Sequence, residues 1–181
     1  MPSNPEAHFP KDYRDARRAF ISACGKAHVD TISRVHPKAM GLDGKPLFMD
    51  CAALGPRKAK KAVLVVGDGA MASAAMTDLL SGGVVLPEGT RLVLIHAFDP
   101  FTFVGVPGDR IWSHTMLRAV ATEDLAQVAD LSVLTLGVTD NDVAQSLAEQ
   151  RPRMTLKSKQ MGAETGIATL RKTVAAELTR R

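Results

Sequence analysis

The chain has 181 residues, of which 45% are hydrophobic, and its net charge is +4, as expected for one globular domain with a substantial core. No apolar run approaches the ~20 residues that a bilayer-spanning helix needs, and residues 1–8 lack the basic and apolar regions of a secretion signal. The two cysteines, Cys24 and Cys51, are too few for a disulfide framework or a zinc cage. Taken together, these features lead us to expect a bacterial-type cytoplasmic protein with reduced thiols and no membrane contact.

The N-terminal third predicts one helix and a β-hairpin. Apolar residues recur at helical spacing over about residues 9–24, and Gly25 is a typical helix stop. Two strand candidates follow, at residues 29–35 and 47–53. The Asp43-Gly44 pair between them is a strong turn signal, so these strands are expected to form a hairpin.

The middle of the chain predicts a parallel βαβ unit. The apolar run 62–66 indicates a buried strand, the turn Gly67-Asp68-Gly69 breaks it, and helix formers fill residues 70–80. A second apolar strand follows at residues 91–97, which is the spacing of a strand, a crossover helix and a parallel strand. Such a turn presents free backbone N–H groups at the edge of the sheet where α/β proteins place ligands.

The C-terminal part adds helices and one more strand. The predicted elements are a short helix capped by Thr122, a strand at residues 131–138, a helix from Thr139 or Asp140 to Pro152, and a last helix over about residues 163–180. An apolar stripe on the last helix consists of Ile167, Leu170, Val174 and Leu178. The whole pattern predicts a single compact α/β domain, residues 1–181, with a mixed, partly parallel sheet flanked by helices.

Positive charge is concentrated near the C-terminus. Residues 151–181 hold eight basic and two acidic residues, a balance of +6, so the other 150 residues balance at −2. A basic segment can contact nucleic acid or an acidic partner. No aromatic residues alternate with these basic ones and no nucleic-acid motif is present. We therefore do not expect nucleic-acid binding and interpret the segment as a solvated helix face.

Three segments of the first half carry motifs in order and at sensible spacing. They read Phe9-Pro-x-x-Tyr13-x-x-Ala16-Arg17-x-x-Phe20, His36-Pro37 followed by Gly41-x-Asp43-Gly44-x-Pro46-Leu47-x-x-Asp50, and His96-Ala97-x-Asp99-Pro100-x-x-Phe103. On these motifs, residues 8–103 resemble an uncharacterised bacterial family related to the zinc carboxypeptidases. The resemblance implies a carboxypeptidase-like fold for this half, whereas residues 104–181 match nothing known to us.

The family's zinc site is missing from this sequence. In the family, the strand equivalent to residues 62–66 runs into Ser-Gly-Thr-His-Gly-Val-Glu-Gly. The His and Glu of this loop bind zinc with a later His, and one position stays open for an activated water. Here the loop is shorter, and Asp68 alone could occupy the Glu position. The family's arginine motif is replaced by residues 105–112, and the chain ends before a third ligand is expected. We therefore interpret the protein as a truncated relative without metal or cofactor.

Polar residues could still form a different site at the sheet edge. Parallel strands would place Asp68, His96 and Asp99 at neighbouring strand ends, with His114 nearby. Two carboxylates and an imidazole can perform general acid–base catalysis, so these four are our catalytic candidates. Our candidate ligand-binding residues are Gly67, Asp68, Gly69, Asp99 and Trp112. The plainer interpretation is that these residues cap helices and turns, and that His96 is a buried, hydrogen-bonded imidazole. Ser73 and Ser81 do not lie in a nucleophile elbow.

Three hypotheses of function remain open. The leading one is a non-catalytic carboxypeptidase-like protein that acts as a binding or assembly subunit, in a homo-oligomer or with a protein partner. The second is a hydrolase with a rebuilt Asp/His site. The third is a nucleotide-binding module, because Gly67-x-Gly69-x-x-Ala72 matches a relaxed dinucleotide fingerprint. Asp99, however, lies 30 residues after Gly69, later than the spacing of ≈ 20 at which the ribose-binding acid is expected.

Overall fold

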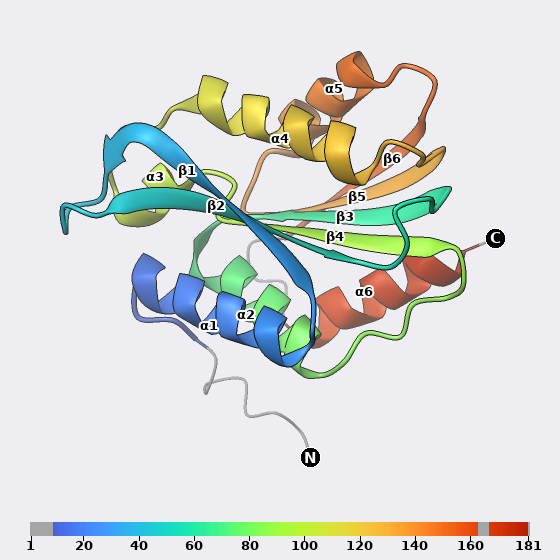
Figure 1. Ribbon diagram of the computed structural model, residues 1–181, viewed down its shortest axis with the longest axis horizontal. Helices are drawn as coiled ribbons and strands as arrows, with labels where there is room; N and C mark the ends of the chain where they lie inside the picture. The colour runs from blue at the N-terminus through green and yellow to red at the C-terminus, as the bar shows by residue number, and fades with distance from the viewer. Residues whose placement is uncertain (1–8, 163–166, 181) are drawn as a thin grey trace.

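The computed structural model describes residues 9–162 and 167–180, which form a helix–sheet–helix sandwich (Figure 1). The elements in chain order are α1 (Tyr13–Lys26), β1 (Asp30–Met40), β2 (Pro46–Leu54), β3 (Lys61–Gly67), α2 (Gly69–Ser81), β4 (Thr90–His96), α3 (Pro100–Val104), α4 (Arg110–Asp124), β5 (Asp130–Leu136), α5 (Asp140–Gln150), β6 (Thr155–Met161) and α6 (Ile167–Thr179). The described strands form one sheet in the order β1-β2-β4-β3-β5-β6. The predicted fold class, α/β with a mixed sheet flanked by helices, is confirmed.

The sheet combines an antiparallel hairpin with a parallel part. β1 pairs antiparallel with β2, and β2 pairs antiparallel with β4. β4, β3, β5 and β6 run parallel to one another. The strands β3, β4 and β5 are buried on both faces, which explains their continuous apolar sequences. The parallel strands end at one edge of the sheet, which we call the carboxyl edge.

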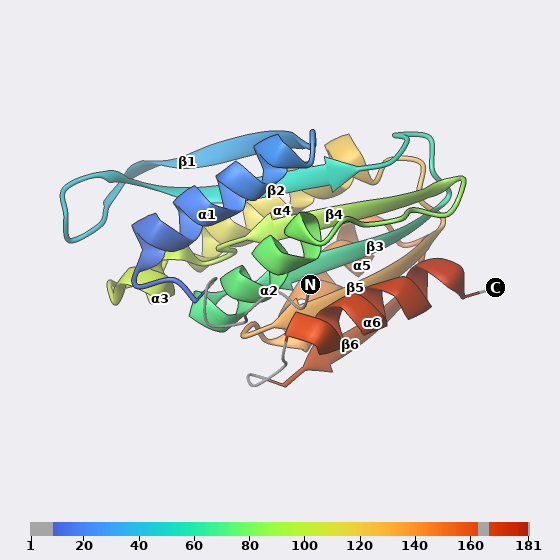
Figure 2. The same cartoon turned by 90° about the horizontal axis from the view of Figure 1, so that it is seen from below.

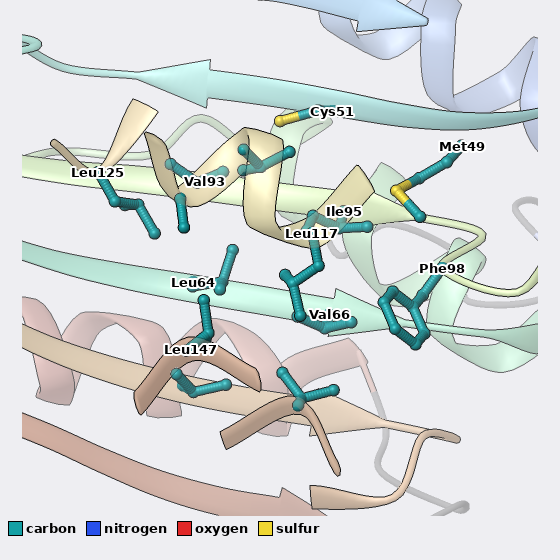
Figure 3. Close-up of a cluster of buried hydrophobic side chains, with 14 of the residues drawn as sticks. Met49, Cys51, Leu64, Val66, Val93, Ile95, Phe98, Leu117, Leu125 and Leu147 are labelled. Carbon is teal, nitrogen blue, oxygen red and sulfur yellow. The ribbon is translucent and has the colours of Figure 1, made fainter. Parts of the chain in front are cut away.

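Helices cover both faces of the sheet, and each face has its own core. Figure 2 shows α1, α2 and α6 on one face and α4 and α5 on the other. Figure 3 shows part of the core beneath α4 and α5, where side chains such as Leu64, Val93 and Leu117 interlock. The second core joins α1, α2 and α6 to the opposite face. None of the described helices is long and apolar enough to cross a membrane.

The predicted elements of the first half are present, but the first helix begins about four residues later than predicted and β1 extends to Met40 rather than to Val35. α1 begins at Tyr13 because the side chain of Asp12 caps it by accepting the N–H of Asp15, at 2.8 Å. The helix continues one residue past Gly25, the predicted stop. The turn at Asp43-Gly44 joins β1 to β2, and Gly44 has the positive φ of 69° that this turn requires. The βαβ unit of β3, α2 and β4 is parallel, as predicted.

Two predictions for the second half are wrong. Thr122 does not cap a short helix: it lies in the last turn of α4, and its Oγ1 donates to the carbonyl of Arg118. The basic segment was interpreted as a helix face, yet Lys157 and Lys159 lie on β6, a strand that was not predicted. As an exposed edge strand, β6 buries little apolar area and so lacks a periodic apolar signal.

The predicted apolar stripe of the last helix packs within the chain. Leu170, Val174 and Leu178 are buried against α2 and the sheet. The side chain of Ile167 lies outside the described residues, as do residues 163–166, where the helix was expected to begin. These three residues of the stripe are therefore covered by the protein's own core.

Candidate functional site

The turns at the carboxyl edge are joined to one another by backbone hydrogen bonds. Gly67 at the end of β3 pairs with His96 at the end of β4. The N–H of Asp68 donates to the carbonyl of Leu136 on β5 at 2.9 Å, and the N–H of Phe98 donates to the carbonyl of Gly67 at 3.1 Å. These bonds connect the ends of β3, β4 and β5 and hold the three turns in a fixed arrangement.

Asp68 and Asp99, two of the candidate residues, lie next to each other at this edge. The backbone N–H of Asp99 donates to Oδ1 of Asp68 at 2.7 Å. Burial raises the pKa of Asp68 well above its ordinary value; the hydrogen bond from Asp99 opposes this shift and the Asp99 charge adds to it. Asp99 in turn caps α3, because its carboxylate accepts the N–H groups of Phe101 and Thr102. Both carboxylates therefore stabilise the local backbone by accepting its N–H groups.

His96 is fully buried on the face covered by α1 and α2. Its Nε2 lies 2.7 Å from Oγ of Ser73 on α2, and its ring stacks on Phe20 of α1 at 4.5 Å. Burial, assisted by the positive charge of Arg17, lowers the pKa of His96 to about 3. The imidazole is therefore neutral at physiological pH. Its contacts are with Ser73 and Phe20 rather than with Asp68 and Asp99.

The imidazole of His96 lies in space between the Ser73 hydroxyl and the Asp50 carboxylate, as the histidine of a serine hydrolase triad does. Sequence reasoning missed this arrangement. Nδ1 of His96 lies 4.0 Å from Oδ2 of Asp50, too far for a hydrogen bond, and has no partner among the described residues. The Asp50 carboxylate is instead held by Arg17 and Ser33. The sequence carries no direct signal for this arrangement. Asp50 pairs with His96 across β2 and β4, and that pairing could be predicted only if the register of the two strands were known.

His114 and Trp112 both lie on α4. The His114 ring contacts the Phe98 ring edge-on at 5.4 Å, and burial and the charge of Arg110 lower its pKa. Trp112 is buried against His36 and Phe101. The structure thus brings together Asp68 and Asp99, and places His96, His114 and Trp112 in three other environments.

The glycines of the β3–α2 turn have packing roles. A Cβ at Gly67 would lie 2.8 Å from the Met76 side chain and 3.0 Å from Ala72, so glycine permits close contact between β3 and α2. Gly69 has a φ of 83° and starts α2. Asp68 precedes the helix but its side chain makes no capping bond to it. Nucleotide binding at residues 67–72 remains a prediction.

The residues at this edge do not fit the zinc ion that the resemblance implies. Zinc in a catalytic site needs three protein ligands around one open position. Asp68 is the single candidate in the turn after β3, and His96 is fully buried beside Ser73. Over residues 9–162 and 167–180, no group of three His, Cys, Asp or Glu side chains is arranged to hold a metal ion.

Comparison with solved structures finds remote similarities. Glutaminyl cyclase from Fimbriiglobus ruber is 12% identical, with a TM-score of 0.46 over 75% of this chain and 62% of that one. An aspartoacylase family protein from Mesorhizobium loti is 12% identical, with a TM-score of 0.47 over 83% and 66%. Carboxylesterase from Bacillus subtilis is 11% identical, with a TM-score of 0.44 over 84% and 50%. The chain thus spans between half and two thirds of these proteins, and similarities this remote say nothing of its chemistry.

Sequence comparison gives a family. No curated protein sequence matches the chain. A family model described as "Protein of unknown function (DUF2817)" matches residues 9–105. This stretch nearly coincides with residues 8–103, which carry the motifs of the opening helix, the hairpin and the end of β4. It covers more than half of the chain, and the protein therefore belongs to the DUF2817 family.

Proposed function

We propose that this protein is a non-catalytic, carboxypeptidase-like protein that acts by binding, as a subunit of an assembly. One observation carries the proposal: each candidate residue at the carboxyl edge is occupied by an internal contact. Asp68 accepts the N–H of Asp99, Asp99 caps α3, and His96 contacts Ser73 inside the core. A general acid or base must reach the proton that it transfers. Here His96 is buried in the core, and both carboxylates already accept backbone N–H groups.

The same edge supports the loss of metal chemistry. The zinc carboxypeptidase relatives use a His and a Glu from the loop after this strand, and here that loop is the turn Gly67-Asp68-Gly69. The Asp68 carboxyl is held by Asp99 and its raised pKa disfavours the charged form that a metal ligand needs.

A surface for assembly is offered by the β1–β2 hairpin. The hairpin projects past the helices at one end of the molecule (Figure 1). Val35, Met40 and Leu42 on it are exposed apolar side chains, and Leu42 is 84% exposed. Single exposed apolar residues are ordinary, but a group on one projecting hairpin is typical of a contact surface. We propose that a second copy of the chain binds here, with a partner protein as the alternative if the purified chain is a monomer.

Two measurements test this proposal. We expect the purified full chain to hydrolyse ester, amide and peptide substrates no faster than its Asp68→Asn variant. We also expect light scattering coupled to gel filtration to find an oligomer that the double variant Met40→Ser/Leu42→Ser disrupts. Val85→Ser, which removes an exposed apolar side chain on the loop between α2 and β4, should leave the oligomer intact. Hydrolysis abolished by Asp68→Asn but retained by His28→Gln would refute the non-catalytic function.

The second candidate function is a hydrolase centred on Ser73. The contact of 2.7 Å between Ser73 and His96, with Asp50 beyond, favours it. A fluorophosphonate probe labels activated serines. We expect Ser73 to stay unlabelled because it is 2% exposed. Labelling of the wild-type protein that Ser73→Ala abolishes, and Ser81→Ala does not, would establish the hydrolase instead.

A further inference from the structure

The outer edge of β1 is open to a further strand. β1 stands at the end of the sheet and, among the described strands, pairs with β2 alone. Every second residue of an edge strand points its N–H and C=O groups away from its neighbour, so these groups are available for pairing. Figure 2 shows β1 as the outermost strand at this edge, and none of its residues is buried.

The two halves of β1 differ in their protection against such pairing. Beyond Val35 the register with β2 shifts, Pro37 lacks an N–H group, and Nδ1 of His36 takes the N–H of Ala39 at 2.9 Å. Proline, lysine and bulges are the usual devices that keep edge strands from pairing. Residues 30–35 contain neither proline nor lysine and pair with β2 in regular register. The first half of β1 is therefore the half that can accept a strand.

The two edges of the sheet differ in the same way. The other edge strand, β6, carries Lys157 and Lys159, and both are exposed. On β1, Ile32 is 40% exposed and Val35 is 49% exposed. Lysines oppose pairing because their charges would have to lie against the added strand. An exposed isoleucine on an open edge instead favours pairing, because an added strand would cover it.

The first half of β1 is complementary to a second copy of itself. A two-fold axis perpendicular to the sheet pairs two copies antiparallel and keeps each face of the sheet on the same side. With the axis at Ile32, that side chain lies opposite its own copy, and Thr31 lies opposite Ser33. Asp30 then lies opposite Arg34, a pair of opposite charges that occurs twice by symmetry. Moving the axis by one residue either way would place the isoleucine opposite a charged side chain.

The charged pair is compatible with the contacts inside one chain. Asp30 is exposed, and its carboxylate forms no ion pair with any described residue. Nη2 of Arg34 lies 2.6 Å from Oε2 of Glu123 on α4. A guanidinium carries five N–H donors, so this ion pair leaves donors for a second carboxylate. The Asp30 of a second copy would supply that carboxylate.

We propose that two copies of the chain join through residues 30–34 of β1, antiparallel and about a two-fold axis at Ile32. The inference rests on the proposed assembly through the β1–β2 hairpin and specifies its partner and its register. The partner is a second copy because the charges of the strand are complementary to those of the same strand. The result is one sheet that runs through both copies.

The first test is disulfide trapping of the full chain carrying Ile32→Cys, with diamide as the oxidant. Opposite residues of an antiparallel pair have Cα atoms about 4.5–5.5 Å apart, within the ~4.4–6.8 Å that a disulfide spans. Val35→Cys is the matched control, because its two copies would lie about 20 Å apart in this register. We expect Ile32→Cys to form a covalent dimer at least tenfold faster. The wild-type protein should form none, since Cys24 and Cys51 are buried.

The second test is the mass of the full chain by light scattering coupled to gel filtration, over a range of concentrations. The wild-type protein should reach twice the mass of one chain. Ile32→Lys places two like charges opposite each other at the axis and should raise the dimer dissociation constant by roughly tenfold or more. Ile111→Lys, the same change at an isoleucine of α4 that is 83% exposed, should not. Far-ultraviolet circular dichroism checks that both variants are folded.

Two results would overturn the inference. One is equal trapping of Ile32→Cys and Val35→Cys. The other is an oligomer that folded Ile32→Lys leaves intact. If Met40→Ser/Leu42→Ser still disrupts that oligomer, the proposed assembly stands and the pairing through β1 alone is wrong. A chain that stays monomeric at every concentration refutes both self-assembly through the hairpin and pairing through β1.

Discussion

Oγ of Ser73 on α2 lies 2.7 Å from Nε2 of His96 at the end of β4, and both side chains are buried. The same imidazole stacks on Phe20 of α1, so a single ring connects two helices to the sheet. Its other nitrogen faces Asp50 at 4.0 Å. A neutral imidazole packs favourably in these surroundings. A charged imidazolium would lose its hydration there, which costs free energy.

We predict that His96 makes the protein sensitive to mild acid. The folded-state pKa of about 3 lies below the ordinary 6.5, so below pH 6.5 the unfolded chain binds the proton more readily. The stabilisation is complete above pH 6.5 and is lost as the pH falls towards 3, at up to ~1.4 kcal/mol per pH unit. Urea unfolding followed by Trp112 fluorescence should show a shallower pH dependence for His96→Gln than for the wild-type protein. His28→Gln should keep the wild-type dependence, and equal slopes for all three proteins would contradict the prediction.

We predict an alkaline titration for the buried phenol of Tyr13. Its hydroxyl donates to the carbonyl of Phe48 at 2.9 Å and accepts the Phe48 N–H at 2.8 Å. Burial raises the pKa of Tyr13 to about 12, so its stabilisation is complete below pH 10 and is lost between pH 10 and 12. Because the chain has one tyrosine, near-ultraviolet absorbance reports this group alone. A midpoint near 10 while Trp112 fluorescence stays native would show that the phenol is accessible.

We predict a large loss of stability on removing one partner of the Arg91–Asp124 ion pair. Nη2 of Arg91 lies 2.7 Å from Oδ1 of Asp124, and each side chain is 4% exposed. Asp124→Ala leaves a buried guanidinium unpaired and should lower the free energy of unfolding by about 3–5 kcal/mol. The double variant Arg91→Met/Asp124→Leu should recover most of that loss. Arg18→Ala, which breaks an exposed pair with Asp15, should change stability by less than ~1 kcal/mol.

We predict that alanine at Gly137 is more destabilising than alanine at Gly44. Both glycines have a φ of 69°, so both substitutions carry a similar backbone cost of about 1–2 kcal/mol. At Gly44 a Cβ meets nothing within 4 Å, but at Gly137 it would lie 2.6 Å from the carbonyl oxygen of Asp68. The clash should add a further ~1–3 kcal/mol. Equal losses in urea unfolding would show that the turns at the carboxyl edge yield easily.

We predict the tautomer of His36. Its Nδ1 accepts the N–H groups of Ala39 at 2.9 Å and Lys38 at 3.2 Å, so the neutral ring must carry its proton on Nε2. That proton is donated to Oδ2 of Asp109 at 3.0 Å, and this bond holds the pKa of Asp109 below its ordinary value. Nitrogen-15 NMR at alkaline pH should show the Nε2–H form. Asp109→Ala also removes the cap of α4 and should cost about 1 kcal/mol.

Local periodicity allowed much of the first half to be predicted. The run 62–66, the glycine turn and residues 91–97 identified the parallel unit because a strand buried on both faces has an unbroken apolar sequence. The same reasoning placed Asp68 and Asp99 at neighbouring strand ends, where they are joined by a hydrogen bond. It failed for β6, because an exposed edge strand gives no such pattern.

Tertiary structure alone decided which polar side chains meet. Ser73, His96 and Asp50 come from a helix and two strands, and their contact depends on the register of β2 with β4 and on the face that α2 covers. Arg110 and Asp142 form an ion pair only because α4 and α5 pack side by side on the same face. The sequence by itself determined the buried strands β3 and β4 and their shared edge, since apolar spacing encodes which surfaces are buried. The pairing of polar groups followed from packing, because hydrogen bonds act over a few ångströms between residues that are distant in the chain.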